Sequence, residues 1–196
     1  MTTRVVAIAY HSGYGHTAVL AGAVRDGAVE AGAVVHPVKV DRITEKQWGL
    51  LDAADAIVFG SPTYMGTASS AFHQFAETTF KRFAGHSWKD KPAAGFSNSG
   101  AKSGDKLHTL QYFAILAAEH GMTWVNLGLH PGWSSTTGSE DDLNRLGFYL
   151  GAPAQTHTDV GTDEVHKADL ATAAYLGRRI AEQARIYAAG RSVVGG

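Results

Sequence analysis

The feature that most constrains the fold is a nearly continuous apolar run at residues 5–10, Val-Val-Ala-Ile-Ala-Tyr, followed at once by a glycine-rich turn and a long segment of helical period. An apolar run without polar alternation is typical of a parallel strand that is buried on both faces. In residues 17–32 the apolar positions share one helical stripe, namely Leu20, Val24, Ala28 and Ala31. The chain therefore opens with a predicted strand–turn–helix unit.

The same alternation continues along the chain. It predicts strands at residues 5–10, 33–40, 56–59, 92–97 and 122–129, and helices at residues 17–32, 44–53, 69–83, 108–120 and 163–189. Residues 130–162 lack a clear period and predict a long loop, and residues 190–196 predict a frayed tail. Strands interleaved with helices predict an α/β fold, with a doubly wound five-stranded parallel sheet and helices on both faces. A length of 196 residues suits a single domain, residues 1–196.

Composition excludes several functional classes. The chain has no cysteine, so disulfides, thiol nucleophiles and thiolate-bound metals are excluded. A formal net charge of −1 provides no basic field for nucleic acid, so no nucleic-acid partner is expected. The apolar runs are too short to cross a membrane, and no signal peptide is evident at the start, so a cytoplasmic location is expected. The ten histidines form no metal-binding motif, and no metal site is predicted.

Ligands of doubly wound sheets bind at the carboxyl ends of the strands, where this chain has three unusual loops. The first contains Ser12, Gly13, Tyr14, Gly15, His16 and Thr17. Its closely spaced N–H groups, its hydroxyls and the following helix start can hold a phosphate without a lysine. The loop matches neither the Walker pattern nor a full dinucleotide fingerprint, so a mononucleotide phosphate suits it best. The alternative is a tight turn in which Ser12 or Thr17 caps the helix.

The second loop contains Pro62, Thr63, Tyr64, Met65 and Gly66, and the third contains Ser97, Asn98, Ser99, Gly100, Ala101 and Lys102. The second can flank a flat ring, and the third presents amides and hydroxyls to a polar ligand. The alternatives are a rigid turn and a solvated loop. The third loop narrowly misses the nucleophile elbow, so a hydrolase that uses Ser97 or Ser99 remains a remote alternative.

Taken in order, these loops and the sequence His120-Gly121-Met122 resemble the flavodoxin-like, FMN-dependent NAD(P)H:quinone oxidoreductases of the tryptophan-repressor-binding-protein (WrbA) type. The resemblance covers most of the chain. It implies that the first loop holds the phosphate of noncovalently bound FMN, the second lines the ring, and the third wraps the pyrimidine edge. It also implies that His120 lies near the ring, as the only candidate catalytic residue, and that Tyr64, Phe83 and Trp133 form the substrate pocket. Tyr64 and Thr67 stand where the family commonly has a basic residue and asparagine.

The activity that the resemblance implies is a two-step cycle, in which NADH or NADPH reduces FMN and a quinone then accepts two electrons. It also implies a homodimer or homotetramer whose pockets are completed by a neighbouring subunit. Two alternatives stay open: an electron carrier of the flavodoxin type, and a non-enzymatic FMN-binding assembly protein. The small net charge argues against the carrier, because such proteins are usually strongly acidic.

Overall fold

The computed structural model describes residues 3–194, which pack around a parallel sheet of strand order β2-β1-β3-β5-β6. The strands are β1 (Val5–Tyr10), β2 (Val34–Lys39), β3 (Ala56–Tyr64), β5 (Pro92–Ser99) and β6 (Thr123–Trp124). The predicted α/β class, doubly wound around a parallel sheet, is confirmed. Because β1 lies between β2 and β3, the chain reverses its winding direction there, and the carboxyl ends of β1 and β3 border the crevice typical of such sheets.

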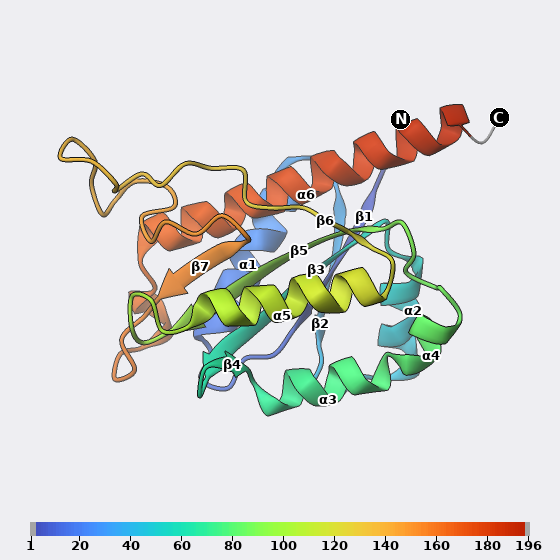
Figure 1. Cartoon of the computed structure of the whole chain (residues 1–196), viewed down its shortest axis with the longest axis horizontal. Coiled ribbons are helices and arrows are strands. Elements are labelled where there is room, and N and C mark those ends of the chain that lie inside the picture. The colour runs from blue at the N-terminus through green and yellow to red at the C-terminus, as the bar shows by residue number, and fades with distance from the viewer. Residues whose placement is uncertain (1–2, 195–196) are drawn as a thin grey trace.

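Helices cover both faces of the sheet (Figure 1). On one face lie α1 (His16–Glu30) and α6 (Lys167–Val194), and on the other lie α2 (Glu45–Ala53), α3 (Ser70–Thr78), α4 (Phe80–Ala84) and α5 (Lys106–Glu119). Alternate residues of β1 feed the two cores: Ile8 packs toward α1 and α6, and Ala9 packs toward the opposite helices. Because both faces of β1 are buried in a core, its sequence is continuously apolar.

The fifth position of the sheet is filled by two short strands in line. β6 pairs with the start of β5, and β7 (Ala152–Gln155) pairs in parallel with the end of β5, from Phe96 to Ser99. Two predictions are therefore wrong: the strand at residues 122–129 stops at Trp124, and the loop at residues 130–162 contains β7. After Trp124 the chain turns away, and the Leu127 N–H donates to the Tyr149 carbonyl on the returning segment.

Other boundaries also differ from prediction. The helix predicted at residues 69–83 is broken at Thr79, whose hydroxyl donates to the Ala76 carbonyl. β4 (Thr67–Ala68) pairs antiparallel with the end of β3, and a short 3-10 helix (Thr162–Glu164) precedes α6. The predicted tail at residues 190–196 is helical as far as Val194, and residues 195–196 lie outside the described residues.

Two properties follow for the described part of the chain. None of its helices is long and apolar enough to cross a membrane. Residues 3–194 also contain no group of three or more histidine, aspartate or glutamate side chains that could hold a metal ion.

Candidate functional site

A cavity of about 420 Å³ opens at the carboxyl ends of β1, β3, β5 and β7, a size that suits a small-molecule ligand. The structure brings the three predicted loops together there. The lining residues are Tyr14, His16, Thr17, Pro62, Thr63, Tyr64, Asn98, Ser99, Gly100, Thr156 and Thr158. The remaining predicted residues of the same loops flank this cavity rather than line it: Ser12, Gly13, Gly15, Met65, Gly66, Ser97, Ala101 and Lys102.

The first loop leaves several backbone donors free at the start of α1. The Ser12 hydroxyl accepts the N–H groups of Gly15 and Ala18, at 3.2 and 3.1 Å, so Ser12 does stabilise the turn and the helix start. Within the described residues, however, the N–H groups of residues 13, 14, 16 and 17 donate to no protein acceptor. The first turn of α1 also contains no acidic residue. Free donors at the positive end of a helix dipole fit a phosphate group.

The second loop is a tight hairpin between β3 and β4. Thr63 pairs with Ala68, and the two turn residues, Met65 and Gly66, have φ values of +48° and +87°. Positive φ at both positions is the geometry of a type I′ turn. The turn projects Met65 fully into solvent, and its Gly66 carbonyl lies 2.7 Å from Nδ1 of His108 on α5.

Tyr64 closes the hairpin against the first loop. Its ring packs edge to face on Tyr14, with ring centroids 6.2 Å apart. A Cβ atom on Gly13 would lie 2.5 Å from the Tyr64 hydroxyl, so glycine at residue 13 permits this approach. Burial raises the pKa of Tyr64, which keeps its hydroxyl protonated at neutral pH. The wall between the two loops is therefore aromatic and uncharged.

Among the described residues, the hydroxyl groups of Ser97 and Ser99 have no histidine or carboxylate within hydrogen-bonding distance. Ser97 is completely buried, and its Oγ lies 2.8 Å from the Thr63 hydroxyl, which also contacts the Thr109 hydroxyl at 2.7 Å. The Ser99 hydroxyl accepts a hydrogen bond from Lys106 and donates to the Ala101 carbonyl. A serine nucleophile needs a group that accepts its proton, whereas the Lys106 ammonium donates its three N–H groups to the Ser99 hydroxyl and to two loop carbonyls. The structure thus gives no support to the hydrolase alternative.

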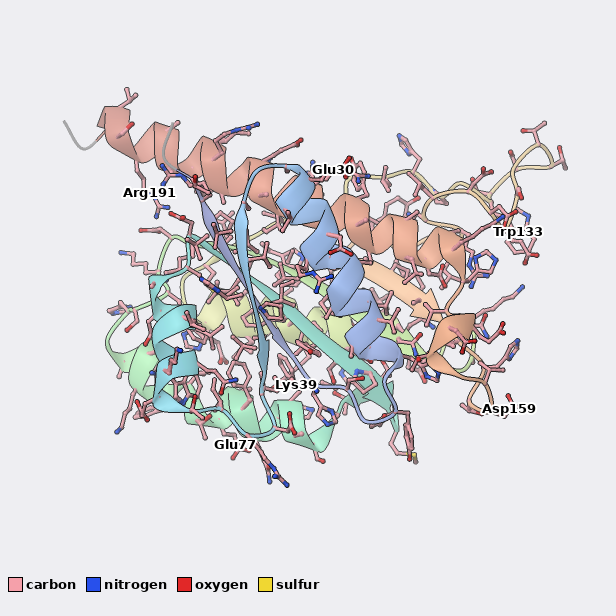
Figure 2. The ribbon with its side chains drawn as sticks, turned by 180° about the vertical axis from the view of Figure 1, so that it is seen from behind. Glu30, Lys39, Glu77, Trp133, Asp159 and Arg191 are labelled. Atoms are coloured by element: carbon pink, nitrogen blue, oxygen red, sulfur yellow. The ribbon has the colours of Figure 1, made fainter. Side chains whose placement is uncertain are left out.

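A fourth wall, absent from the sequence prediction, follows β7. The Thr156 hydroxyl donates to the Asn98 side-chain oxygen at 3.1 Å, and Thr158 packs beside Gly100. The same segment reaches α1, where Nε2 of His16 lies 3.1 Å from the Val160 carbonyl. Figure 2 shows this segment, around Asp159, beside the start of α1. Its only signal in the sequence is the short apolar stretch of β7.

The third loop rests on Lys106, the first residue of α5. Its Nζ donates to the Ser99 hydroxyl and to the carbonyls of Ala101 and Lys102, at 2.8, 2.7 and 3.0 Å. Lys106 is completely buried, and this burial lowers its pKa to about 8. On the outer side of the loop, the ammonium of Lys102 lies 4.9 Å from the ring centre of Trp133, so Trp133 borders the loop without lining the cavity.

His120 and Phe83 lie elsewhere. They line a separate cavity of about 420 Å³ with Ala76, Glu77, Thr79, Phe80, Leu116 and Glu119. α5 begins beside the third loop at Lys106 and ends at Glu119, so its 14 residues separate His120 from that loop by roughly 20 Å at 1.5 Å per residue. Within one chain, His120 and Phe83 therefore do not line the cavity formed by the three loops, and their contact with the cofactor stays a prediction that concerns a second copy of the chain.

Within its own cavity, His120 is held by Thr79. Its Nε2 lies 2.8 Å from the Thr79 hydroxyl, its Nδ1 has no partner among the described residues, and burial lowers its pKa. The Thr79 hydroxyl already donates to the Ala76 carbonyl, so it accepts from a neutral His120 ring that carries its proton on Nε2.

Known proteins resemble this chain over most of its length. The family model described as "NADPH-dependent FMN reductase" matches residues 26–129, just over half of the chain. Flavodoxin FldP of Pseudomonas aeruginosa is 38% identical over 89% of this chain and 93% of its own length. An NAD(P)H dehydrogenase (quinone) of Archaeoglobus fulgidus is 32% identical over 91% of this chain and 96% of its own length.

Solved structures confirm the flavodoxin-like fold. The crystal structure of a flavodoxin, WrbA-like protein from Agrobacterium tumefaciens superposes with a TM-score of 0.76 at 39% identity, over 94% of this chain and 99% of the other. The same assignment follows from the family model, from the two relatives that match most of the chain, and from this superposition. It confirms the resemblance that the loops indicate. The chain belongs to the NADPH-dependent FMN reductase family of flavodoxin-like proteins.

Proposed function

We propose that this protein is an FMN-dependent oxidoreductase that transfers hydride from NADH or NADPH to a quinone-like acceptor. The observation that carries the proposal is the set of free N–H groups at residues 13, 14, 16 and 17, placed at the mouth of a cavity between three loops. Such donors suit the phosphate of a mononucleotide. Relatives named NAD(P)H dehydrogenase (quinone), at about 30% identity over most of the chain, support the reaction class.

The residues present fit FMN as the cofactor. The first loop would hold the phosphate, from Ser12 to Thr17. Pro62, Thr63 and Tyr64 would line the ring, with the Met65-Gly66 turn beside it. Asn98, Ser99 and Gly100 of the loop at residues 97–102 would hold its polar edge, with Thr156 and Thr158 closing the fourth wall. FMN, when bound, supplies the hydride and electron chemistry that no side chain provides.

The chain itself contributes binding and orientation. The buried hydrogen bonds among Thr63, Ser97 and Thr109 fix the floor of the site, and the Tyr14–Tyr64 contact forms one wall. His16 is the only lining residue with an imidazole, and it contacts the Val160 and Gly161 carbonyls. The structure therefore provides orientation of reactants rather than general acid–base catalysis.

The second candidate function is a one-electron carrier, because a relative at 38% identity is named a flavodoxin. The two functions differ in their response to free nicotinamide. The decisive measurement is the visible spectrum of the FMN-loaded protein without oxygen, before and after NADH or NADPH and then a quinone. Bleaching by nicotinamide and recovery with quinone would establish the oxidoreductase, and a flavin band that resists both nicotinamides would establish the carrier.

The phosphate assignment has its own test. The double variant Ser12→Ala, Thr17→Ala is expected to bind FMN at least tenfold more weakly than the unmodified protein, since two hydroxyls beside the free N–H groups are lost. Ser134→Ala is a matched control, because Ser134 also hydrogen-bonds within its own loop but does not line the cavity. Equal affinity in the double variant and the control would remove the phosphate site from this loop.

Three further expectations belong to this proposal. We expect a homodimer or a homotetramer, measurable by light scattering during gel filtration. We expect a cytoplasmic location, measurable by cell fractionation. Within an oligomer, Trp133 and the separate cavity around Phe83 and His120 remain candidate substrate contacts, because Phe83 and Trp133 are 44% and 42% exposed.

A further inference from the structure

Three charged side chains are buried together beneath the third loop. Lys106, Arg145 and Asp169 are exposed by 0%, 7% and 2%. Arg145 forms a two-pronged ion pair with Asp169, with Nε and an Nη each 2.8 Å from a carboxylate oxygen. Because this pair is neutral, the cluster as a whole holds one positive charge, located on Lys106.

The cluster orients the peptide groups of the loop. Lys106 donates hydrogen bonds to the carbonyls of Ala101 and Lys102, and the Gln155 side-chain amide donates to the Gly100 carbonyl at 2.9 Å. Gln155 is fixed in turn, because its backbone N–H donates to Asp169 at 2.9 Å. The carbonyls of three successive residues are thus held by donors from the protein interior.

This arrangement determines where the N–H groups point. In a trans peptide the N–H lies opposite the C=O, so the N–H groups of residues 101, 102 and 103 point away from the buried donors. Within the described residues none of them donates to a protein acceptor. Successive free N–H groups above a buried positive charge attract an electronegative group.

We propose that Lys106 is a positioning residue for the cofactor site: its ammonium group holds the loop at residues 99–102 in the shape that closes the cavity, and it places a buried positive charge behind the wall, formed by Ser99 and Gly100, that would face bound FMN. The link to the cavity is direct, since Ser99 and Gly100 line it and Lys106 donates to the Ser99 hydroxyl. The inference rests on the proposed function, because it takes FMN as the ligand.

The role of Lys106 depends on its protonation. The ammonium has three N–H donors and uses all of them, whereas a neutral amine has two and leaves one loop acceptor unpaired. The charged groups that face it are Asp169, Arg145 and Asp105. With the pKa lowered by burial to about 8, the loop loses a hydrogen bond and the cluster loses its net charge between pH 7 and 9.

The test is fluorescence titration of the full-length protein with FMN between pH 7 and pH 9. We expect the Kd of the unmodified protein to rise about fivefold to tenfold over this range. Lys106→Met is expected to bind about tenfold more weakly at pH 7 and to show a flat profile. Lys91→Met is the matched control. Lys91 also has a pKa lowered by burial, and it donates to the Leu51 and Asp52 carbonyls. It lies just before the amino-terminal end of β5, at the end of the strands opposite to the cavity.

Hydrogen exchange of the FMN-free protein supplies an independent measurement. The amide of Thr156, whose N–H donates to the Ser99 carbonyl at 3.2 Å, is expected to exchange faster in Lys106→Met than in Lys91→Met at the same pH. Unchanged exchange, or a Kd for Lys106→Met equal to that of the control, would overturn the role of Lys106 alone. An unmodified protein that binds no FMN would overturn the proposed function and this inference together.

The proposal remains testable if Lys106→Met does not fold. In that case Ser99→Ala, which removes one acceptor and leaves the lysine in place, is measured beside the pH profile of the unmodified protein. Weaker binding in Ser99→Ala together with a rising Kd toward pH 9 would support the role of Lys106. A flat profile in the unmodified protein would overturn it.

Discussion

The ion pair beneath the third loop makes a strong prediction about stability. Replacing Asp169 with asparagine removes the carboxylate that accepts two hydrogen bonds from Arg145 and one from the Gln155 backbone. It also leaves the buried positive charge of Arg145 without a counter-charge, close to that of Lys106. Since both side chains of the pair are only 3% exposed, water cannot replace the lost contacts. Breaking a buried pair in this way costs about 3–5 kcal/mol of the free energy of unfolding.

The assay is equilibrium unfolding in urea, with thermal melting as a second measurement. For a protein of this size, 1 kcal/mol corresponds to about 2–4 °C, so the melting temperature is expected to fall by roughly 6–20 °C. Glu30→Gln is the matched control, because Glu30 pairs with Arg178 on α6 at 2.9 Å but is 68% exposed. An exposed pair contributes about 0–1 kcal/mol, so the control is expected to lose no more than that.

A double variant separates the loss of the pair from the burial of an unpaired charge. Replacing both partners with apolar residues, Arg145→Met with Asp169→Leu, is expected to cost less than Asp169→Asn alone, because no orphaned guanidinium remains. If Asp169→Asn costs under about 1 kcal/mol, like the exposed control, then the pair does not hold the loop and the reasoning about this cluster is wrong.

Three other outcomes follow from the structure. Between pH 8 and 10, the free energy of unfolding of the unmodified protein is expected to rise by up to about 1.4 kcal/mol per pH unit relative to Lys106→Met. The reason is that the unfolded chain keeps the lysine proton that the folded chain has lost. Urea unfolding at several pH values measures this difference. Gly177→Ala is expected to destabilise by about 1–3 kcal/mol in urea unfolding, since its Cβ would overlap the Val24 carbonyl on α1 and backbone cannot yield easily; a cost near zero would contradict the close helix contact. Met65→Asn is expected to stabilise by about 0.5–1 kcal/mol in thermal unfolding, because asparagine tolerates the positive φ of the turn better than methionine, and a loss of stability would contradict the turn assignment.

The sequence was sufficient to predict the parts of the site that depend on local chain geometry. The continuous apolar run of β1 predicts a doubly buried strand, and the glycines after it predict a turn into a helix, as Gly15 shows with a φ of +96°. The loops after β3 and β5 meet the first loop because parallel strands present their carboxyl ends at one edge of the sheet. The turn-forming glycines and this rule for parallel strands together predict where the cavity lies.

The rest depends on contacts that are distant in sequence. β7 is only four residues long and contains Pro153, so neither period nor propensity indicates a strand. Two contacts at its carboxyl end help to fix its pairing with β5: the Gln155 N–H donates to Asp169, and the Thr156 hydroxyl donates to Asn98. Nothing in the sequence distinguishes Lys106 from an ordinary surface residue at the start of a helix. Only the fold reveals that it is buried and bound to the third loop.

His120 illustrates a different limit. It lies in the short motif His120-Gly121-Met122, yet a motif does not show which end of a helix faces the cavity, and α5 carries His120 to the far end from the third loop. The residue at the near end, Lys106, is the one that contacts the loop. Because α5 is straight and 14 residues long, a single chain cannot bring both ends to the same cofactor. Any contact of His120 with a flavin must therefore involve a second copy of the chain, whereas the effect of Lys106 belongs to each chain by itself. FMN binding by a monomeric form is thus expected to respond to Lys106→Met and to be indifferent to His120→Gln.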